Sequence, residues 1–472
     1  MLTNLNFLGT GQPWPPNNQE ERLRLRRYRD NKLLFEGRHE LVFKEVFTRL
    51  FRRDPAMKMS VEMCLNWPKR LTTLWADLLV GETPIVEDGT EGAEYLTDLA
   101  QRVNLWHKVY TAAIDASRYG NAVFKVRRDE DGLKVDVIPP ACWFPVVSPT
   151  DSKKITAHVL AWPTGEVDEG TGQLHVEIHT KGRVEYRVYE RGGAVFAKDS
   201  PLGSIGRLME NREEKTGADS MLVMAVSNLE TSDSIYGQDD YTDLTSIIQE
   251  LEVRFAQLAR ILDRHADPIM YGPDDTSTDE NGNKVANIGT YVPVMDGDAP
   301  PGYVTWDAQT ASCFQQIDSL MEQFYVLSET SPAVFGNTKN GLAESGSALK
   351  RLLMAPLAKV NRTRANFDTA VKEVLKLAAL MDSGADVDPV IQWKDGLPDD
   401  TAEMVQTENI AVSAGITSKQ TAMRRVYGYS EEQARAELAL IEEESPPLAD
   451  PTTLTDPSYD GLKKDDGGGE EE

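Results

Sequence analysis

The sequence predicts a mixed α+β protein that is mainly helical. Two observations support this: most of the chain carries apolar residues at helical spacing, and residues 121–198 alternate apolar and polar residues as strands do. With 472 residues, 40% of them hydrophobic, the chain can bury two or three ordinary cores. A globular protein of several parts is therefore expected.

Net charge and cysteine content narrow the classes of function. The 50 basic and 76 acidic residues give a formal charge of −26, which repels nucleic acid and anionic membranes unless basic residues are segregated. Cys64, Cys142 and Cys313 form no CxxC pair, so neither a disulfide framework nor a zinc module is expected. No leader pattern and no run of about 18 apolar residues occurs. A reducing, intracellular setting without membrane insertion fits best.

The first 119 residues are predicted to be helical after a flexible start. Residues 1–19 are polar and rich in proline. Helical spacing then marks residues 20–50, 68–79 and 91–119, and Gly81 and Gly120 close the second and third helices. The arginine run from Arg22 to Arg29 is interpreted as a solvated helix face.

The alternating region predicts an antiparallel sheet, with turns at Asp131-Gly132, Lys181-Gly182 and Gly192-Gly193. Within it, His175, Glu177 and His179 share one strand face, a spacing that could offer metal ligands. Alternating polar residues are also typical of the solvent-exposed face of such a strand, and this interpretation is favoured. No metal site is expected.

Two long helices with an irregular insert follow. A short apolar strand, LVMAV, and a polar turn precede an amphipathic helix over residues 240–266. Residues 267–307 break into short strand-like pieces among turn residues, and helical spacing resumes over residues 308–331. Such a pair of helices is expected to hold a small structure at its tip.

The stretch GNTKNGLAESGSALKRLLMAP, from Gly336 to Pro356, admits two interpretations. It could cradle a phosphate, or it could be a mobile loop between two long helices. A P-loop needs G-x-x-x-x-G-K-[ST] between a strand and a helix, but here Lys339 lies inside the loop and Gly346 is not followed by lysine. Nucleotide binding is therefore disfavoured. No HExxH or GxSxG pattern occurs elsewhere, so neither a catalytic residue nor a cofactor is expected.

A third long helix is predicted to reach about Met381, with a kink near Met354 because Pro356 lies inside it. Three short helices follow beyond Trp393. Their signals are capping boxes at Thr417 with Gln420 and at Ser430 with Gln433, and the closing glycines Gly415 and Gly428. The acidic, proline-rich and glycine-rich residues 445–472 are predicted to be disordered.

The order of these elements resembles that of the portal proteins of tailed bacteriophages, of the siphophage type, from about Arg22 to Glu444. Four stretches carry the resemblance: VSNLETSDSIYGQDDYTDLTSIIQEL, HADPIMYGPD, SPAVFGNTKNGLAESGSALK, and the segment from WKDGLPDD to ELALIEEE. In the first, an asparagine, a turn and a glycine precede the acidic start of a helix. The order of all four is more specific than any one of them.

The resemblance implies a portal fold with named parts. Residues 20–239 would form the wing, 240–266 and 308–331 the stem helices, and 267–307 a small α/β clip. Residues 332–346 would form a tunnel loop, 347–397 the kinked helix and the return to the wing, and 398–444 a helical crown. The tunnel-loop residues that would face DNA are Gly336, Asn337, Lys339, Asn340, Gly341 and Gly346.

The resemblance also implies a function without catalysis. Twelve subunits would form a ring at one vertex of the capsid in the virion, through which double-stranded DNA is packaged and ejected. The implied partners are the terminase large subunit, the head-tail adaptor, and the major capsid and scaffolding proteins, with assembly in the cytoplasm of the bacterial host. Two alternatives stay open: a connector protein without a DNA channel, and a nucleotide-dependent enzyme using residues 336–346.

The negative net charge of the chain is consistent with a channel through which DNA passes. A ring of twelve such chains would carry about −312, which disfavours adhesion of DNA to the wall. The basic residues that follow the glycine-rich stretch are expected to pair with acidic residues of a neighbouring subunit rather than with DNA. These residues are Lys350, Arg351, Lys359, Arg362 and Arg364.

Overall fold

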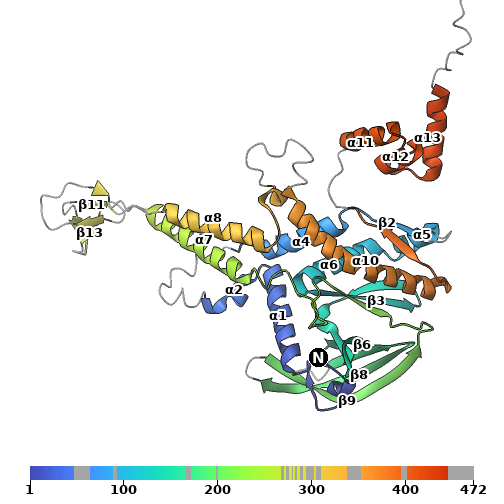
Figure 1. The fold of residues 1–472 in the computed structure, drawn as a ribbon. Helices are drawn as coiled ribbons and strands as arrows, with labels where there is room; N and C mark the ends of the chain where they lie inside the picture. The colour runs from blue at the N-terminus through green and yellow to red at the C-terminus, as the bar shows by residue number, and fades with distance from the viewer. Residues whose placement is uncertain are drawn as a thin grey trace, which may run out of the picture. The chain divides into compact units, whose positions relative to one another are not determined.

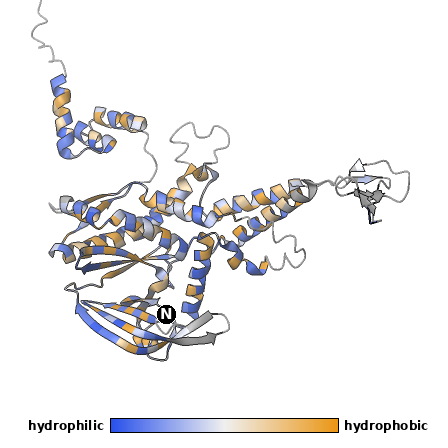
Figure 2. Ribbon diagram, turned by 180° about the vertical axis from the view of Figure 1, so that it is seen from behind, coloured by the Kyte–Doolittle hydropathy of each residue, from blue (hydrophilic) through white to orange (hydrophobic). Residues whose placement is uncertain are grey.

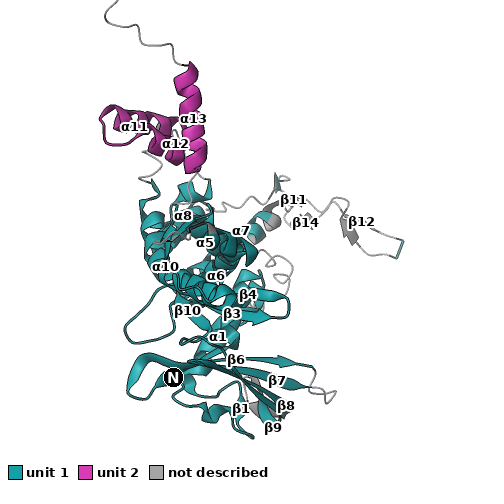
Figure 3. Cartoon of the chain, turned by 90° about the vertical axis from the view of Figure 1, so that its right-hand side faces the viewer, with its two compact units in different colours: residues 1–397 teal, residues 398–472 magenta. Residues whose placement is uncertain are grey.

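The structure, a computed structural model, contains two compact units, residues 1–397 and 398–472 (Figure 3). It describes residues 1–46, 64–88, 93–165, 172–197, 200–266, 270–272, 276–278, 280–281, 284–286, 291–293, 302–303, 310–336, 352–394 and 401–444. Helices and strands are mixed along the chain, which confirms the predicted α+β class. None of the helices in these ranges is long and apolar enough to cross a membrane.

The main hydrophobic core of the first unit lies among helices. They are α1 (Gln19–Phe35), α2 (His39–Val42), α4 (Trp67–Val80), α5 (Ala93–Arg102), α6 (Leu105–Tyr119) and α10 (Met354–Ser383). The helix predicted over residues 20–50 ends at Phe35, because Gly37 takes a left-handed conformation with φ 78°. The helix predicted over residues 91–119 is two helices, because Asn104 between them also has positive φ, 51°.

A three-stranded antiparallel sheet packs against α6 and α10. Its order is β10 (Val223–Ser227), β3 (Asn121–Asp129) and β4 (Gly132–Ile138). Alternate residues of β3 enter different cores: Phe124 and Val126 join the helices, whereas Val123 packs with Trp143 and Leu160 on the opposite face. Strand β2 (Ile85–Asp88) pairs separately with β16 (Pro389–Gln392).

The larger sheet is antiparallel, in the order β1-β9-β8-β7-β6-β5. Its strands are β1 (Pro13–Trp14), β5 (Trp143–Ser148), β6 (Asp151–Thr164), β7 (Gln173–Thr180), β8 (Arg183–Ala197) and β9 (Ser200–Lys215); the 3-10 helix η3 (Pro140–Cys142) precedes β5. The predicted antiparallel region is confirmed, and β9 extends it beyond residue 198. The turn predicted at Gly192-Gly193 is wrong, because both glycines lie inside β8, where the register with β9 shifts.

The first 19 residues are ordered, contrary to the expected flexible start. The 3-10 helix η1 spans Leu5–Leu8, and β1 pairs with β9. Leu2, Leu8 and Trp14 are buried in the core of the larger sheet, with Trp14 against Phe144. Contacts with distant strands therefore order a segment whose local composition is that of a loop.

Two helices form a side-by-side pair, α7 (Thr245–Ala266) and α8 (Thr310–Leu327) (Figure 1). Leu251 and Leu258 of α7 pack with Ile317 of α8, and Figure 2 shows apolar and polar residues alternating along both helices. Helix α7 begins five residues later than predicted, because the Asp239 carboxylate accepts the backbone N–H groups of Tyr241 and Thr242 and holds a turn there.

Short strands lie between α7 and α8 in the sequence, as predicted. They are β11 (Met270–Gly272), β12 (Thr276–Thr278), β13 (Lys284–Ala286), β14 (Tyr291–Pro293) and β15 (Gly302–Tyr303). Strand β11 pairs in parallel with β14 and antiparallel with β15, and β12 pairs with β13. Both helices are thus joined through a small separate β structure.

The second unit contains α11 (Thr401–Ser413), α12 (Lys419–Tyr427) and α13 (Glu431–Glu444), three helices as predicted. The capping box at Ser430 is confirmed, because Ser430 Oγ accepts from the Gln433 amide and Gln433 Oε1 accepts from the Ser430 amide. The capping box at Thr417 is wrong by one residue. Ser418 is the N-cap and accepts from the Thr421 amide at 3.1 Å.

Candidate functional site

Gly336, the first residue of the glycine-rich stretch, has a well-defined position at the end of a short helix. The 3-10 helix η4 (Pro332–Phe335) ends at Gly336, which has φ 82° and donates its N–H to the Ala333 carbonyl. A side chain would be strained in that conformation, so glycine suits the exit. The other predicted tunnel-loop residues, Asn337, Lys339, Asn340, Gly341 and Gly346, lie outside the described residues.

Aromatic contacts anchor this exit. The Phe335 ring lies 5.7 Å from Trp67 at the start of α4 and 6.2 Å from Tyr325 near the end of α8, measured between centroids. Trp67 in turn contacts the buried Phe324 at 5.3 Å. The loop therefore starts beside the end of α8, held to the helical core.

The start of α10, which follows the glycine-rich stretch in the sequence, is also held by packing. Leu353 is buried and is the N-cap of α10, and Leu352 before it is helical. Pro356 is the third residue of α10 and so lies in its first turn, not inside the helix as predicted. Proline is tolerated there because the first turn of a helix has N–H groups without intrahelical acceptors.

A buried ion pair lies where α10 passes the start of α7. Lys359 Nζ is 2.6 Å from Asp240 Oδ1 and 4.2 Å from the centre of the Trp75 ring. Asp240 also accepts from Ser117 Oγ at 2.6 Å and from Asn228 Nδ2 at 2.8 Å. Because these three partners come from α10, α6 and the residue after β10, this carboxylate joins all three to the turn before α7.

A close backbone contact completes this junction. A Cβ on Gly237 would lie 2.1 Å from the Gly120 carbonyl oxygen, and a Cβ on Gly120 would lie 2.2 Å from the Gly237 oxygen. Both positions therefore require glycine. The Asn-turn-Gly-acid pattern noted in the sequence corresponds to Asn228, Gly237 and Asp240, whose shared role is to fix the entry into α7.

Two of the basic residues after the glycine-rich stretch pair with acidic residues of the same chain. Lys359 pairs with Asp240 and Arg362 pairs bidentately with Glu329 at 2.6 and 2.8 Å, all in the same chain. Arg364 donates to the Lys394 carbonyl. Lys359 and Arg362 therefore have acidic partners within their own chain, in the turn before α7 and just after α8, and pairing across a subunit interface stays a prediction. Lys350 and Arg351 lie outside the described residues.

The face of β7 that carries Glu177 and His179 was expected to be exposed to solvent, but it is buried. Glu177 binds Lys125 Nζ at 2.6 Å and His179 Nε2 at 3.0 Å, while the His175 ring stacks on Trp162. The face is covered because the smaller sheet packs over it. Burial opposes the charged form of Glu177, but the bonds from His179 and Lys125 outweigh it and hold the carboxyl pKa below its usual value.

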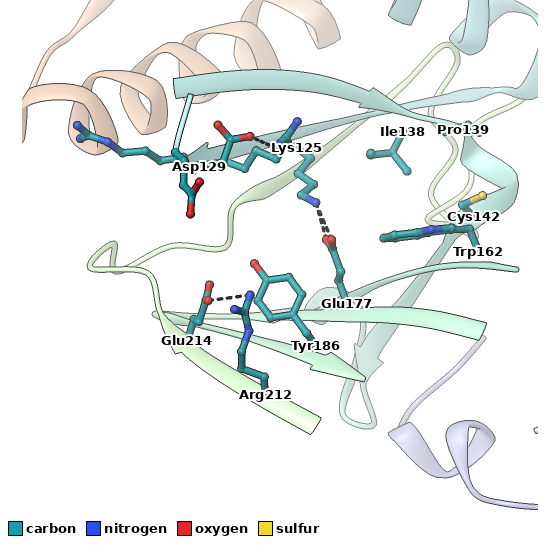
Figure 4. A pocket seen from close by; sticks show the side chains of 13 residues that line it. Lys125, Asp129, Ile138, Pro139, Cys142, Trp162, Glu177, Tyr186, Arg212 and Glu214 are labelled. Carbon is teal, nitrogen blue, oxygen red and sulfur yellow. Dashed lines mark hydrogen bonds and ion pairs between the residues drawn. The ribbon is translucent and has the colours of Figure 1, made fainter. Parts of the chain in front are cut away.

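An open cavity of about 730 Å³ lies beside these residues, between the two sheets (Figure 4). The close-up shows Lys125 pointing toward Glu177 and Arg212 toward Glu214; these ion pairs measure 2.6 and 2.9 Å. Because acids and bases offset one another, the lining indicates no particular ligand.

A comparison with protein families identifies the family of this chain. Residues 17–446 match the family described as phage portal protein, SPP1 Gp6-like. Since this match covers more than half of the chain, the protein is a phage portal protein and belongs to the SPP1 Gp6-like family. No curated protein matches the chain.

Among solved structures, chains of a gene transfer agent (GTA) particle match this chain. The neck of the empty particle, computed with C6 symmetry, and the neck of the native particle, computed with C12 symmetry, each give a TM-score of 0.46 and 12% identity. Both matches cover 76% of this chain and 89% of that chain. The virion of the native particle gives a TM-score of 0.47 and 13% identity, and this match covers 89% of this chain and 96% of that chain. The assignment depends on the family match.

As a phage portal protein, the chain builds the ring-shaped channel at one capsid vertex through which double-stranded DNA is packaged and ejected. This decides against the alternative of a connector protein without a channel.

Proposed function

We propose that twelve copies form the ring, with α7 and α8 as its stem, residues 267–307 as the clip and residues 398–444 as the crown. Residues 332–346 form the tunnel loop, and residues 20–239 and 347–397 form the wing. One observation carries this proposal: both ends of the glycine-rich stretch are anchored where the helix pair meets the core, at Phe335 beside α8 and at Lys359 beside the entry to α7.

Contacts with DNA are proposed to be weak and to come from the tunnel loop. Its glycines allow the backbone to follow a moving duplex, and its small polar side chains contact phosphates without reading bases. Lys339 is the cation of this loop, flanked by Asn337 and Asn340. Lys359 and Arg362 are engaged with Asp240 and Glu329, which supports the loop rather than α10 as the contact.

The partners follow from the same proposal. The terminase large subunit supplies ATP hydrolysis, so this chain is not an enzyme, and the head-tail adaptor later occupies the same vertex. Scaffolding and major capsid proteins surround the ring during assembly in the bacterial cytoplasm. Family membership supports these assignments.

Deletion of residues 337–343 tests the tunnel loop. We expect rings of unchanged subunit number by native mass spectrometry, because Phe335 and Leu353 keep their anchors, and a several-fold drop in nuclease-protected DNA per particle. A matched variant replaces the same seven residues with glycine and serine, which keeps loop length but removes Lys339. Normal yields of filled, infectious particles from the deletion would refute the proposal, and so would rings that fail to close.

A further inference from the structure

Three residues with different metal-binding groups meet beside the first half of α7. They are His39 at the start of α2, Cys64 before α4, and Glu252 in α7. Their ligand atoms all lie within 4.8 Å of one another. The His39 and Glu252 side chains are 2% and 3% exposed, whereas Cys64 is exposed, so the group is open to solvent on the cysteine side.

The position of one proton follows from the hydrogen bonds of His39. Its Nε2 lies 2.9 Å from the Leu34 carbonyl oxygen. Because a carbonyl can only accept, Nε2 carries hydrogen, and the lone pair of a neutral ring is on Nδ1. Nδ1 faces a carboxylate oxygen of Glu252. Two acceptors in contact require a cation between them, either a proton or a metal ion.

Outer contacts hold both groups in this orientation. The bond from Nε2–H to a backbone carbonyl is the arrangement that orients metal-binding histidines in general. Glu252 Oε1 also accepts from the Leu65 amide at 3.3 Å, which ties the carboxylate to the residue next to Cys64. The His39 ring packs against Phe43 at 5.9 Å between centroids.

We propose that His39 Nδ1, Cys64 Sγ and a carboxylate oxygen of Glu252 bind one divalent transition-metal ion of the zinc class, with water as the fourth ligand. Nitrogen, sulfur and oxygen donors together suit such an ion rather than Mg²⁺ or Ca²⁺, which prefer oxygen alone. Ligands of tetrahedral zinc lie roughly 3.3 Å apart. The Glu252 carboxylate therefore moves away from His39 when the ion replaces the proton.

Binding releases protons. A thiol must lose its proton to become a ligand, and the ion also displaces the proton shared by His39 and Glu252. The metal ion would link α2 and the residue before α4 to α7. The proposal is independent of the DNA channel.

Zinc and cobalt titrations of the full-length, untagged, metal-stripped chain test the site. We expect one Zn²⁺ per chain in competition with a chromogenic chelator. With Co²⁺ we expect a thiolate charge-transfer band in the near ultraviolet. Cys64→Ser should abolish that band and weaken zinc binding by more than the roughly 10–100-fold that loss of an outer-shell partner costs. Because Cys64 is exposed, this variant should fold as the parent does.

Cys142→Ser is the matched control, since Cys142 lies in the cavity between the sheets. It should bind both metals as the parent does. The proposal is overturned if the parent takes up no zinc at one equivalent, if Cys64→Ser binds as tightly as the parent, or if Cys142→Ser loses the cobalt band as well.

Discussion

At the scale of single residues, the junction before α7 depends on a buried charge and its compensation. The Asp240 and Lys359 side chains are 5% and 12% exposed, so neither is well solvated. A buried carboxylate is tolerated only when cations and hydrogen-bond donors replace water. Here Lys359, Ser117 and Asn228 provide them.

Replacing Lys359 with methionine should therefore destabilise the first unit strongly. The change leaves Asp240 buried without its cation, and breaking a buried pair typically costs about 3–5 kcal/mol. Arg362→Met is the control, because Arg362 and Glu329 are 50% and 39% exposed and such pairs contribute at most about 1 kcal/mol. Urea unfolding followed by intrinsic fluorescence would compare the two. Equal losses would contradict the assigned role of Lys359.

A second buried group sets a dependence on pH. His158 accepts the indole N–H of Trp143 on Nδ1 at 2.9 Å. Burial, and secondarily the charge of His179, lower the pKa of His158 to about 3. The unfolded chain, with a histidine pKa of about 6.5, then binds more protons as pH falls below that value. The free energy of unfolding must fall with it.

From this group alone, the free energy of unfolding should decrease by about 2 kcal/mol between pH 7 and pH 5. His158→Gln keeps an acceptor for Trp143 but cannot take up the proton, so its urea midpoint should depend less on pH than that of the parent. Identical dependence in both proteins would contradict the assignment.

At the scale of elements, the α7–α8 pair is held by few residues. Leu251 is fully buried in the contact with α8, whereas Leu262 of the same helix is 55% exposed. Leu251→Ala should cost about 2–5 kcal/mol, because it removes buried apolar surface and leaves a cavity. Leu262→Ala should cost far less. Faster amide hydrogen exchange in α7 and α8 of the first variant would confirm the assignment, and equal exchange in both variants would contradict it.

The sequence predicted elements where local rules decide them. Helical spacing located the α7–α8 pair, and Ser430 with Gln433 formed the predicted capping box. Long-range contacts decided the rest. Residues 1–19 are ordered because β1 pairs with β9, and one face of β7 is buried because the smaller sheet packs on it. The alternation of apolar and polar residues along a strand indicates neither contact.

The candidate site also depends on contacts between residues that are far apart in the sequence. Glycine content marked Gly336, and the resemblance marked the turn before α7. The pairing of Lys359 with Asp240 joins residues 119 positions apart, and His39 is 213 positions from Glu252. No sequence spacing defines such groups. For the cysteines, the lack of a CxxC pair indicated no zinc module, whereas the fold brings Cys64 to ligands from other elements.

At the scale of the whole molecule, charge is distributed unevenly along the chain. The last 22 residues, after Asp450, hold seven acidic and two basic residues, among prolines and glycines. They lie outside the described residues. A segment of this composition cannot bury enough apolar surface to offset the entropy of ordering. From its composition, we expect the tail to add negative charge to the ring and to contribute little to folding.

Truncation after Asp450 should accordingly leave the melting temperature and the subunit number of the ring unchanged. It lowers the negative charge of each chain from 26 to about 21, and so reduces the repulsion between the ring and DNA. Differential scanning calorimetry and native mass spectrometry would measure the first two quantities, with the parent ring at equal ionic strength as control. A fall of several degrees in the melting temperature would mean that the tail packs against the folded chain, contrary to what its composition predicts.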